Sequence, residues 1–284
     1  MPIRLFFLCL SWAGIALAVD TNTFVPDMDR GLRESLASAR AKEIEIFDMH
    51  IHLRGGMTAE KAAVRQIMTG IRSGVLENHG RDWPLADNSR LERFLEEVDT
   101  VRKCGVEIFV GIQVNDRDWF KVINPELLAK LDFVLADTMI LGTDREGRPC
   151  KLWLEDRYDI DDVEAWMKRY VDHHLQILDE PVTILANPTF LPKKIADRYA
   201  KLWTKERMEL IIDKAVEKNI AIEIQAGSAF PSTAFLKLAK SKGAKFSFGT
   251  NNHDAKPIDM SRWFRMIDEL GLTRDNLYIP KRND

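Results

Sequence analysis

The sequence predicts one α/β domain in which strands and helices alternate and the strands close into a distorted barrel. Short apolar, β-branched segments recur along the chain, and amphipathic segments with helical spacing separate them. Strict alternation favours a parallel sheet, and roughly seven repeats in 284 residues favour a closed barrel over an open sheet. No change in composition marks a second domain. We therefore expect residues 43–284 to form a single seven-stranded (β/α) barrel that is TIM-barrel-like.

The first strand is expected over residues 44–51, where apolar and polar residues mostly alternate. It runs into His50 and His52, which on a regular strand point to the same face. Gly55 and Gly56 follow and permit a tight turn. Two imidazoles on one face can converge on one divalent cation, so this strand end predicts a metal site.

The remaining elements follow in order. Six more strands are expected at residues 74–79, 106–114, 133–137, 181–188, 220–225 and 245–253. Helices are expected at residues 58–70, 91–103, 125–131, 162–178, 207–218, 233–241 and 260–270. Residues 143–162 have no periodicity and predict a lid or substrate loop.

Two helices carry more detailed expectations. Thr58 is the expected N-cap of the first helix, whose buried stripe is expected to hold Ala62, Ala63, Ile67 and Met68. On the helix at 162–178, one of the adjacent histidines 173 and 174 is expected to face solvent and the other to be partly buried. We expect both histidines to have a structural role.

Residues 1–18 resemble a signal peptide. Arg4 precedes an almost wholly apolar run, and Ala16-Leu17-Ala18 places small residues at the two positions that signal peptidase reads. The apolar run of about 14 residues is short for a bilayer span, which disfavours an uncleaved anchor. We expect cleavage after Ala18 and export to the periplasm or medium, with no membrane attachment afterwards. Residues 19–42 are expected to form a leader and a short outer helix.

Composition excludes some partners. The net charge of -3 and the lack of a basic stripe argue against nucleic acid. Cys104 and Cys150 remain after signal cleavage, and two cysteines form no disulfide framework, so no bridge is predicted.

Polar side chains gather at the predicted C-terminal strand ends, where barrels of this class hold their sites. They are His50, His52, Glu77, His79, Gln113, Asp137, Asn187, Glu223, Gln225, Asn251 and His253. Four of the six histidines fall at these ends, where chance would scatter them. This distribution favours a metal site.

These residues resemble the polymerase and histidinol phosphatase (PHP) family over residues 44–275. Asp48-Met49-His50-Ile51-His52 is similar to its Asp-x-His-x-His motif, and Glu77-Asn78-His79 stands where the family has Thr-Asp-His. Residues 108–115 resemble its third strand, 184–188 its Ile-Leu-x-His-Pro motif, and 248–253 its Gly-Ser-Asp-Ala-His motif. The resemblance implies a distorted seven-stranded barrel that holds two or three divalent metals and hydrolyses phosphate esters.

Four positions depart from the family pattern. Gln113 replaces the bridging glutamate, Asn187 a histidine, Asn251 an aspartate, and Asp137 stands where a histidine is usual. Neutral amides offset little of the repulsion between close cations, so one ion is expected rather than three. The expected ligands of this single zinc or manganese ion are His50, His52, His79, Asp137 and His253.

The leading hypothesis is an exported metal-dependent hydrolase that acts on a small, anionic substrate such as a phosphate ester. Glu223 or Asp137 is the expected base, and Arg54, Arg117 or Lys256 could hold an anionic group of the substrate. Gln113, Asn187 and Asn251 are expected to line the substrate pocket.

Two alternatives remain open. The first is a barrel that has lost hydrolysis and binds a carbohydrate through its amides, with Trp83, Trp119 or Trp153 stacked on a sugar. The second is an amidohydrolase-type barrel, which also opens with His-x-His. It fits less well because the last strand offers Asn251 and His253 in place of a lone aspartate.

Overall fold

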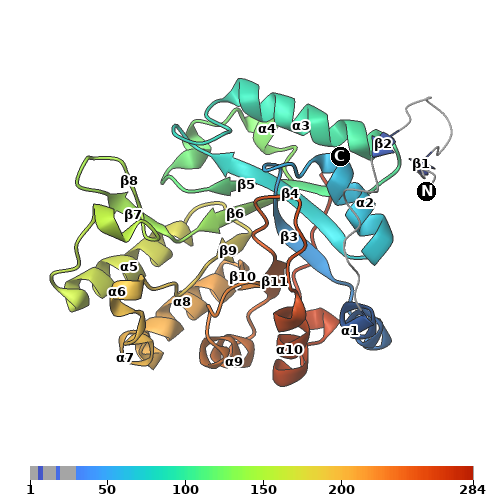
Figure 1. Ribbon diagram of the computed structural model, residues 1–284. Helices are drawn as coiled ribbons and strands as arrows, with labels where there is room; N and C mark the ends of the chain where they lie inside the picture. Colours follow the sequence, from blue (N-terminus) through green and yellow to red (C-terminus); the bar gives the residue numbers. More distant parts are fainter. Residues whose placement is uncertain (1–5, 9–16, 20–29, 284) are drawn as a thin grey trace.

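The computed structural model describes residues 6–8, 17–19 and 30–283 of the chain (Figure 1). Within these residues, seven parallel strands close into a barrel in the order β10-β11-β3-β4-β5-β6-β9. They are β3 (Phe47–His52), β4 (Arg72–His79), β5 (Phe109–Val114), β6 (Phe133–Asp137), β9 (Ile184–Ala186), β10 (Ala221–Gln225) and β11 (Phe246–Gly249). Because β9 pairs with both β6 and β10, the barrel sheet has no free edge. The predicted seven-stranded (β/α) barrel is confirmed.

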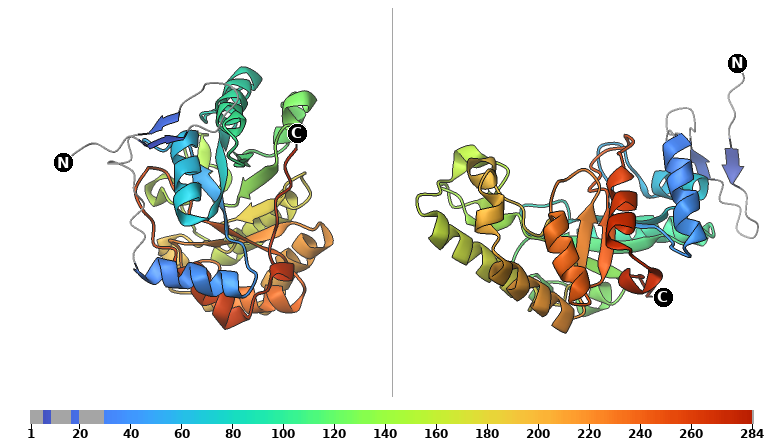
Figure 2. Two further views of the ribbon diagram at one scale, coloured as in Figure 1. Left: turned by 90° about the vertical axis from the view of Figure 1, so that its right-hand side faces the viewer. Right: turned by 90° about the horizontal axis from the view of Figure 1, so that it is seen from below.

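Helices surround the barrel on its outside (Figures 1 and 2). They are α1 (Arg30–Ala41), α2 (Ala59–Thr69), α3 (Asn88–Lys103), α4 (Pro125–Leu128), α5 (Val163–Ile177), α6 (Lys193–Ala196), α7 (Tyr199–Leu202), α8 (Lys205–Glu217), α9 (Thr233–Ser241) and α10 (Ser261–Leu270). Short 3-10 turns occur at Trp119–Lys121, Glu155–Arg157 and Arg274–Asn276. None of the helices in residues 30–283 is both long and apolar enough to cross a membrane.

The predicted signal peptide and the leader that follows it lie largely outside the described residues. The two short strands that are described there, β1 (Phe6–Leu8) and β2 (Leu17–Val19), pair antiparallel with each other. The outer helix expected before residue 42 is α1.

Helix α2 begins where its cap was predicted, but its buried face differs. The Thr58 side chain accepts a hydrogen bond from the Lys61 backbone N–H at 3.3 Å. The prediction that Ile67 and Met68 are buried was wrong, because their side chains are 50% and 39% exposed. The helix is rotated so that Arg65 packs inward instead.

The barrel strands end earlier than the apolar patterns suggested. The strands predicted at 181–188 and 245–253 are only Ile184–Ala186 and Phe246–Gly249. Asn187 and Asn251 have left-handed backbone conformations, with φ of 50° and 52°, which end the extended chain. Asparagine tolerates this conformation better than most residues.

The predicted lid segment at 143–162 is not wholly irregular. Strands β7 (Ile140–Thr143) and β8 (Pro149–Lys151) form an antiparallel hairpin beside the barrel, and a 3-10 turn follows. Figure 1 shows this hairpin projecting near α5. The expectation for the α5 histidines was wrong, since His173 and His174 are only 7% and 0% exposed.

The barrel interior is filled by an apolar cluster below its polar end. We call this cluster the plug; it consists of Phe47, Met49, Leu76, Phe109, Phe133, Leu135, Ile184, Ala186 and Ala221. Tyr278 of the C-terminal tail packs against it, and the Tyr278 N–H donates to the Phe246 carbonyl at 2.8 Å. A second, larger apolar layer lies between the sheet and the helices. The polar strand ends are therefore supported from below by a solid floor.

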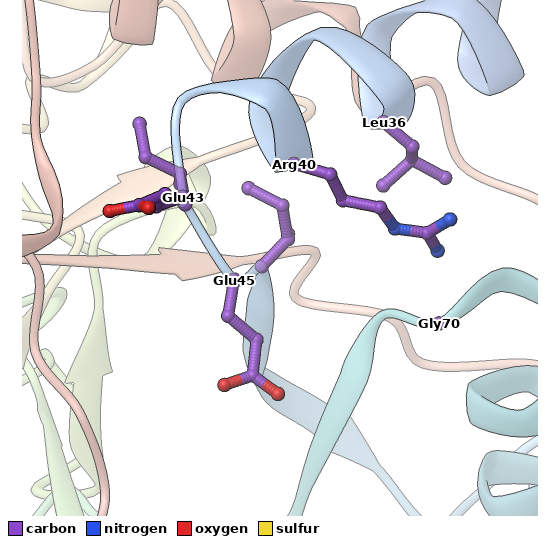
Figure 3. Close-up of a pocket in the computed structure, with 7 residues that line it drawn as sticks. Leu36, Arg40, Glu43, Glu45 and Gly70 are labelled. Atoms are coloured by element: carbon purple, nitrogen blue, oxygen red, sulfur yellow. The ribbon is translucent and has the colours of Figure 1, made fainter.

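Helix α1 packs near the start of β3, at the opposite end of the barrel from the polar strand ends. Arg40 Nη2 donates to the Thr69 carbonyl oxygen at 3.1 Å, at the point where α2 ends in Gly70. Figure 3 shows the Arg40 side chain extended toward Gly70, on one side of a small pocket that also contains Glu43 and Glu45.

Candidate functional site

The C-terminal ends of the barrel strands converge on a buried polar cluster. His50 and His52 are 0% exposed and Glu223 is 1% exposed. The remaining members of the cluster are also buried: Glu77, Gln113, Asp137, Asn187 and Gln225. The structure thus brings together most of the strand-end residues that the sequence singled out.

A break in the register of β3 orients the two histidines. The pairing of β3 with β4 shifts between Asp48 and Ile51. Before the shift, Phe47 and Met49 point into the barrel and join the plug. After it, His50 also points inward, as does His52. A bulge of this kind is a known way of re-aiming a side chain next to a site.

The two imidazoles of β3 face each other. The Nε2 atoms of His50 and His52 are 3.2 Å apart. Two imidazole nitrogens that bind one tetrahedral cation at about 2.0–2.1 Å lie about 3.3 Å from each other. The spacing of the pair therefore matches one edge of a tetrahedral coordination sphere, and it is also the distance of a hydrogen bond between the two rings.

His50 is held at both ring nitrogens. Its Nδ1 lies 2.5 Å from Glu223 Oε1, and its Nε2 lies 2.9 Å from Gln113 Oε1. Burial disfavours the charged imidazole, but the charge and hydrogen bond of Glu223 outweigh this effect and raise the pKa of His50 above its ordinary value. A carboxylate on the remote nitrogen of a histidine is also the usual support for a metal ligand.

His52 has a different environment. Arg54 Nη2 lies 3.1 Å from His52 Nδ1 and also binds Glu77 Oε2 at 2.5 Å. Burial, with the neighbouring positive charges of His50 and Arg54, lowers the pKa of His52 to about 3. Burial would raise the pKa of Glu77, but its close contacts with His52 and Arg54 lower it to about 2. Arg54 is therefore committed to Glu77 and does not stand free to receive an anion.

Amide side chains surround Asp137. Asn187 Nδ2 donates to Asp137 Oδ1 at 3.0 Å, and Gln113 Nε2 donates to Oδ2 at 3.3 Å. Gln225 Nε2 donates in turn to Asn187 Oδ1 at 2.9 Å. Burial raises the pKa of Asp137, against the opposing effect of its hydrogen bonds. The amides of Gln113, Asn187 and Gln225 thus form a network around this carboxyl group.

Two of the predicted metal ligands form no hydrogen bond with the His50–His52 pair among the described residues. His79 is buried near Asp116, and its Nδ1 has no hydrogen-bond partner among the described residues. His253 is exposed, and its Nε2 lies 3.0 Å from Asn251 Oδ1. Its ring contacts that of His52 edge-on, with centroids 4.4 Å apart. His253 therefore lies at the rim above the pair.

The donors that remain fit one cation at most. In residues 30–283, no group of three or more His, Cys, Asp or Glu side chains is placed to hold a metal ion. The available set is His50 Nε2, His52 Nε2 and the Gln113 oxygen, which is three donors of the N and O types that zinc and manganese accept. The predicted ligands His79, Asp137 and His253 are not part of this set and stay predictions.

The charges of the cluster suit the same conclusion. Arg54 pairs with Glu77, and Arg65 pairs with Asp48. Asp137 and Glu223 have no Arg or Lys within ion-pair distance among the described residues, and the partner of Glu223 is the imidazole of His50, so these carboxyl groups lie where a cation would be favoured. One contact does not suit a metal ligand. Because Arg54 Nη2 donates to His52 Nδ1, this contact favours a proton on His52 Nε2, the atom that would bind the ion. Glu77 Oε1, 3.6 Å from Nδ1, is the nearest acceptor for the other tautomer.

No protein-family model matches this chain, and no curated protein is detectably similar to it.

Asp48 and Arg65 support the site in a way that the sequence did not reveal. Asp48 Oδ1 accepts from the Thr250 backbone N–H at 2.9 Å, and Oδ2 accepts from Thr250 Oγ1 at 2.8 Å and from Arg65 Nη2 at 2.5 Å. This buried network ties β11 and α2 to the strand that carries His50. The available signal was an arginine on the buried face of α2. It was overlooked because the predicted buried face included Ile67 and Met68 instead.

Other predicted residues have structural partners. Arg117 pairs with Glu180 at 3.0 Å, and the highly exposed Lys256 is 3.7 Å from Asp254. Trp119 is 2% exposed and cannot stack on a sugar, whereas Trp153 is 44% exposed. Cys104 and Cys150 are both free thiols.

Proposed function

We propose that the chain is a metal-dependent hydrolase of the phosphoester type, in which His50 and His52 hold one zinc or manganese ion. The observation that carries the proposal is the 3.2 Å separation of their Nε2 atoms, with Glu223 on the far nitrogen of His50. The order of the PHP-like motifs along the chain supports the same reading. A bound cation would supply polarisation of the ester and activation of water near neutral pH.

The chain's own residues have distinct roles in this proposal. Glu223 accepts a hydrogen bond from the Nδ1–H of His50 and fixes the orientation of the ring. It is therefore a positioning residue rather than the base. Arg54 holds Glu77 against His52 and has the same kind of role. Asp137 is the remaining candidate for proton transfer, because its raised pKa brings it closer to the working range of an acid or base.

Residues at the rim would contact the substrate. His253 and Asn251 lie on the solvent side of His52 and can donate or accept hydrogen bonds there. Asn187 is occupied by Asp137 and acts by shaping the pocket, whereas the Gln113 oxygen, 2.9 Å from His50 Nε2, is the third donor available to the ion. The buried floor excludes water from below.

The test is elemental analysis of the purified mature protein beside a His50→Ala, His52→Ala double variant and a His79→Ala control. About one equivalent of metal is expected in the unchanged protein and in the control, because His79 forms no hydrogen bond with the pair, and none in the double variant. Metal that persists in the double variant would contradict the proposed ligands. A panel of phosphate esters then tests turnover.

A second candidate is a barrel without turnover that binds a carbohydrate. It is favoured by one observation: no three-ligand group of His, Cys, Asp or Glu occurs in the described chain, while the amides around Asp137 are well ordered by hydrogen bonds. Absence of metal from all three proteins would select this reading. Sugar binding would then be measured by calorimetry.

We also propose that the chain is exported after cleavage behind Ala18. N-terminal sequencing of protein recovered from the medium or periplasm tests this. A mature chain that begins at Val19 is expected, and an intact Met1 would oppose export by cleavage.

A further inference from the structure

A groove of about 790 Å³ opens between the hairpin β7–β8, helix α5 and the segment that follows β5. Its size falls in the range of small-molecule sites, about 300–1,000 Å³. Asn115 lies in its wall, and the Asn115 Oδ1 atom accepts from Gln113 Nε2 at 3.2 Å. Because Gln113 in turn contacts His50, the groove adjoins the barrel centre.

Charged groups of both signs line the groove. Asp116 lies toward β4, next to Gly80 and His79. Arg169 lies on α5, close enough to the hairpin for its charge to oppose in part the burial that raises the pKa of the Cys150 thiol. The groove wall thus offers hydrogen-bond acceptors at Asp116 and a guanidinium group at Arg169.

The guanidinium group of Arg169 has unused binding capacity. Arg169 forms no ion pair or hydrogen bond with any residue that the structure describes, and the charge of the neighbouring Asp172 is met by Lys168 at 2.8 Å. Arg169 and His173 are four residues apart on α5, so both lie on the helix face that lines the groove.

Two buried polar atoms in the groove wall also lack partners. Arg117 Nε and His173 Nε2 have no hydrogen bond in the described chain, and His173 is only 7% exposed. Buried polar groups in native proteins are nearly always satisfied, so each such atom needs an explanation. Both atoms are buried in this structure, so a polar occupant of the groove pairs with them only if the Arg117 or His173 side chain moves.

We propose that this groove binds the part of the substrate that is not hydrolysed, and that this part carries an anionic group, a phosphate or carboxylate, recognised by Arg169. Asp116 accepts hydrogen bonds, which suits hydroxyl groups on the same molecule. The substrate class is then a small polyol or sugar with an acidic group. That the occupant is a substrate rests on the hydrolase proposal, whereas anion binding by the groove does not.

The test titrates inorganic phosphate into the purified protein at constant ionic strength, followed by calorimetry. Arg169→Gln is compared with Arg93→Gln, an exposed arginine of α3 that lies outside the groove. Loss of a charged hydrogen-bond donor is expected to weaken phosphate binding about tenfold in Arg169→Gln and to leave it unchanged in Arg93→Gln. Equal binding by the two variants, or no binding by the unchanged protein, would overturn the proposal.

The same titration in the His50→Ala, His52→Ala background separates the two proposals. Retained binding that still depends on Arg169 supports the groove, even if the metal assay has failed. Phosphate binding that disappears with the histidines and ignores Arg169 would locate the anion at the barrel centre alone. That result would refute the groove and leave the hydrolase proposal intact.

Discussion

At the scale of single residues, the site depends on a close approach between β10 and β11. Gly249 lies directly beside the His50–Glu223 contact. A methyl group at this position would collide with Glu223 Oε1 and come within 2.7 Å of His50 Cβ. The backbone of Gly249 is not in the left-handed region, so the glycine is needed for space and not for conformation.

Gly249→Ala is therefore expected to lower the free energy of unfolding by about 1–3 kcal/mol and to reduce bound metal, because the Glu223 side chain must shift. Urea unfolding and elemental analysis measure the two effects. Gly227→Ala is the matched control, since no atom lies within 4 Å of a methyl group there. Equal stability of the two variants would show that Glu223 relaxes at no cost.

At the scale of secondary-structure elements, α1 and α2 are joined by one arginine. Gly70 has φ of 73°, and a methyl group on it would collide with Arg40 Nη2, which donates to the Thr69 carbonyl. Gly105 has φ of 82°, but no atom lies within 4 Å of a methyl group there. Comparing substitutions at Gly70 and Gly105 therefore separates the effect of backbone strain from the effect of losing the Arg40 contact.

Both Gly70→Ala and Gly105→Ala are expected to lose about 1 kcal/mol of stability through backbone strain. Gly70→Ala is expected to lose about a further 1 kcal/mol, because Arg40 must release the Thr69 carbonyl. Chemical denaturation of the two variants measures the difference. Equal losses would mean that the Arg40 contact contributes no net stability.

The sequence predicts elements better than it predicts their rotation and ends. The apolar runs at 106–114 and 133–137 indicated buried strands, because residues covered on both faces are hydrophobic throughout. The rotation of α2 was missed because Arg65 is buried only through its pairing with Asp48, which lies 17 residues away. Likewise, Asn187, which has a positive φ, is held by hydrogen bonds to Asp137 and Glu223, residues that are distant in the sequence.

The candidate site shows the same division. The alternation of apolar and polar residues predicted that His50 and His52 lie at a strand end. The close approach of their rings depends on the bulge in β3. The partners of Arg54 and Asp137 could not be read from the sequence, since each joins strands that are far apart in the chain. The β3 bulge was missed as well, because the alternation of apolar and polar residues along a strand does not show where an extra residue interrupts it.

At the scale of the whole molecule, buried imidazoles couple stability to pH. Burial lowers the pKa of His174 from its ordinary value of 6.5 to about 4. Between these two values the unfolded chain binds a proton that the folded chain does not. The free energy of unfolding therefore falls as the pH drops from 6.5 toward 4, and the full contribution is present above 6.5.

Urea unfolding at pH 7 and pH 5 tests this linkage. The unchanged protein is expected to lose about 2 kcal/mol from His174 alone over this interval. The loss is expected to be smaller by that amount in His174→Leu, whatever its absolute stability. His173, whose pKa is lowered to about 3, contributes in the same direction and keeps some pH dependence in the variant. If the free energy of unfolding changes equally with pH in the two proteins, the His174 contribution is excluded.

The bulge in β3 lets one strand serve both halves of the barrel interior. A regular strand of six residues would turn only three side chains inward, but β3 turns four: Phe47, Met49, His50 and His52. The first two are part of the plug and the last two form the polar centre. Without the bulge, strict alternation from Phe47 and Met49 would point both His50 and His52 at the helix layer. The two histidines thus reach the site because β3 carries one residue more than β4 at this point, and not because of the His-x-His spacing alone.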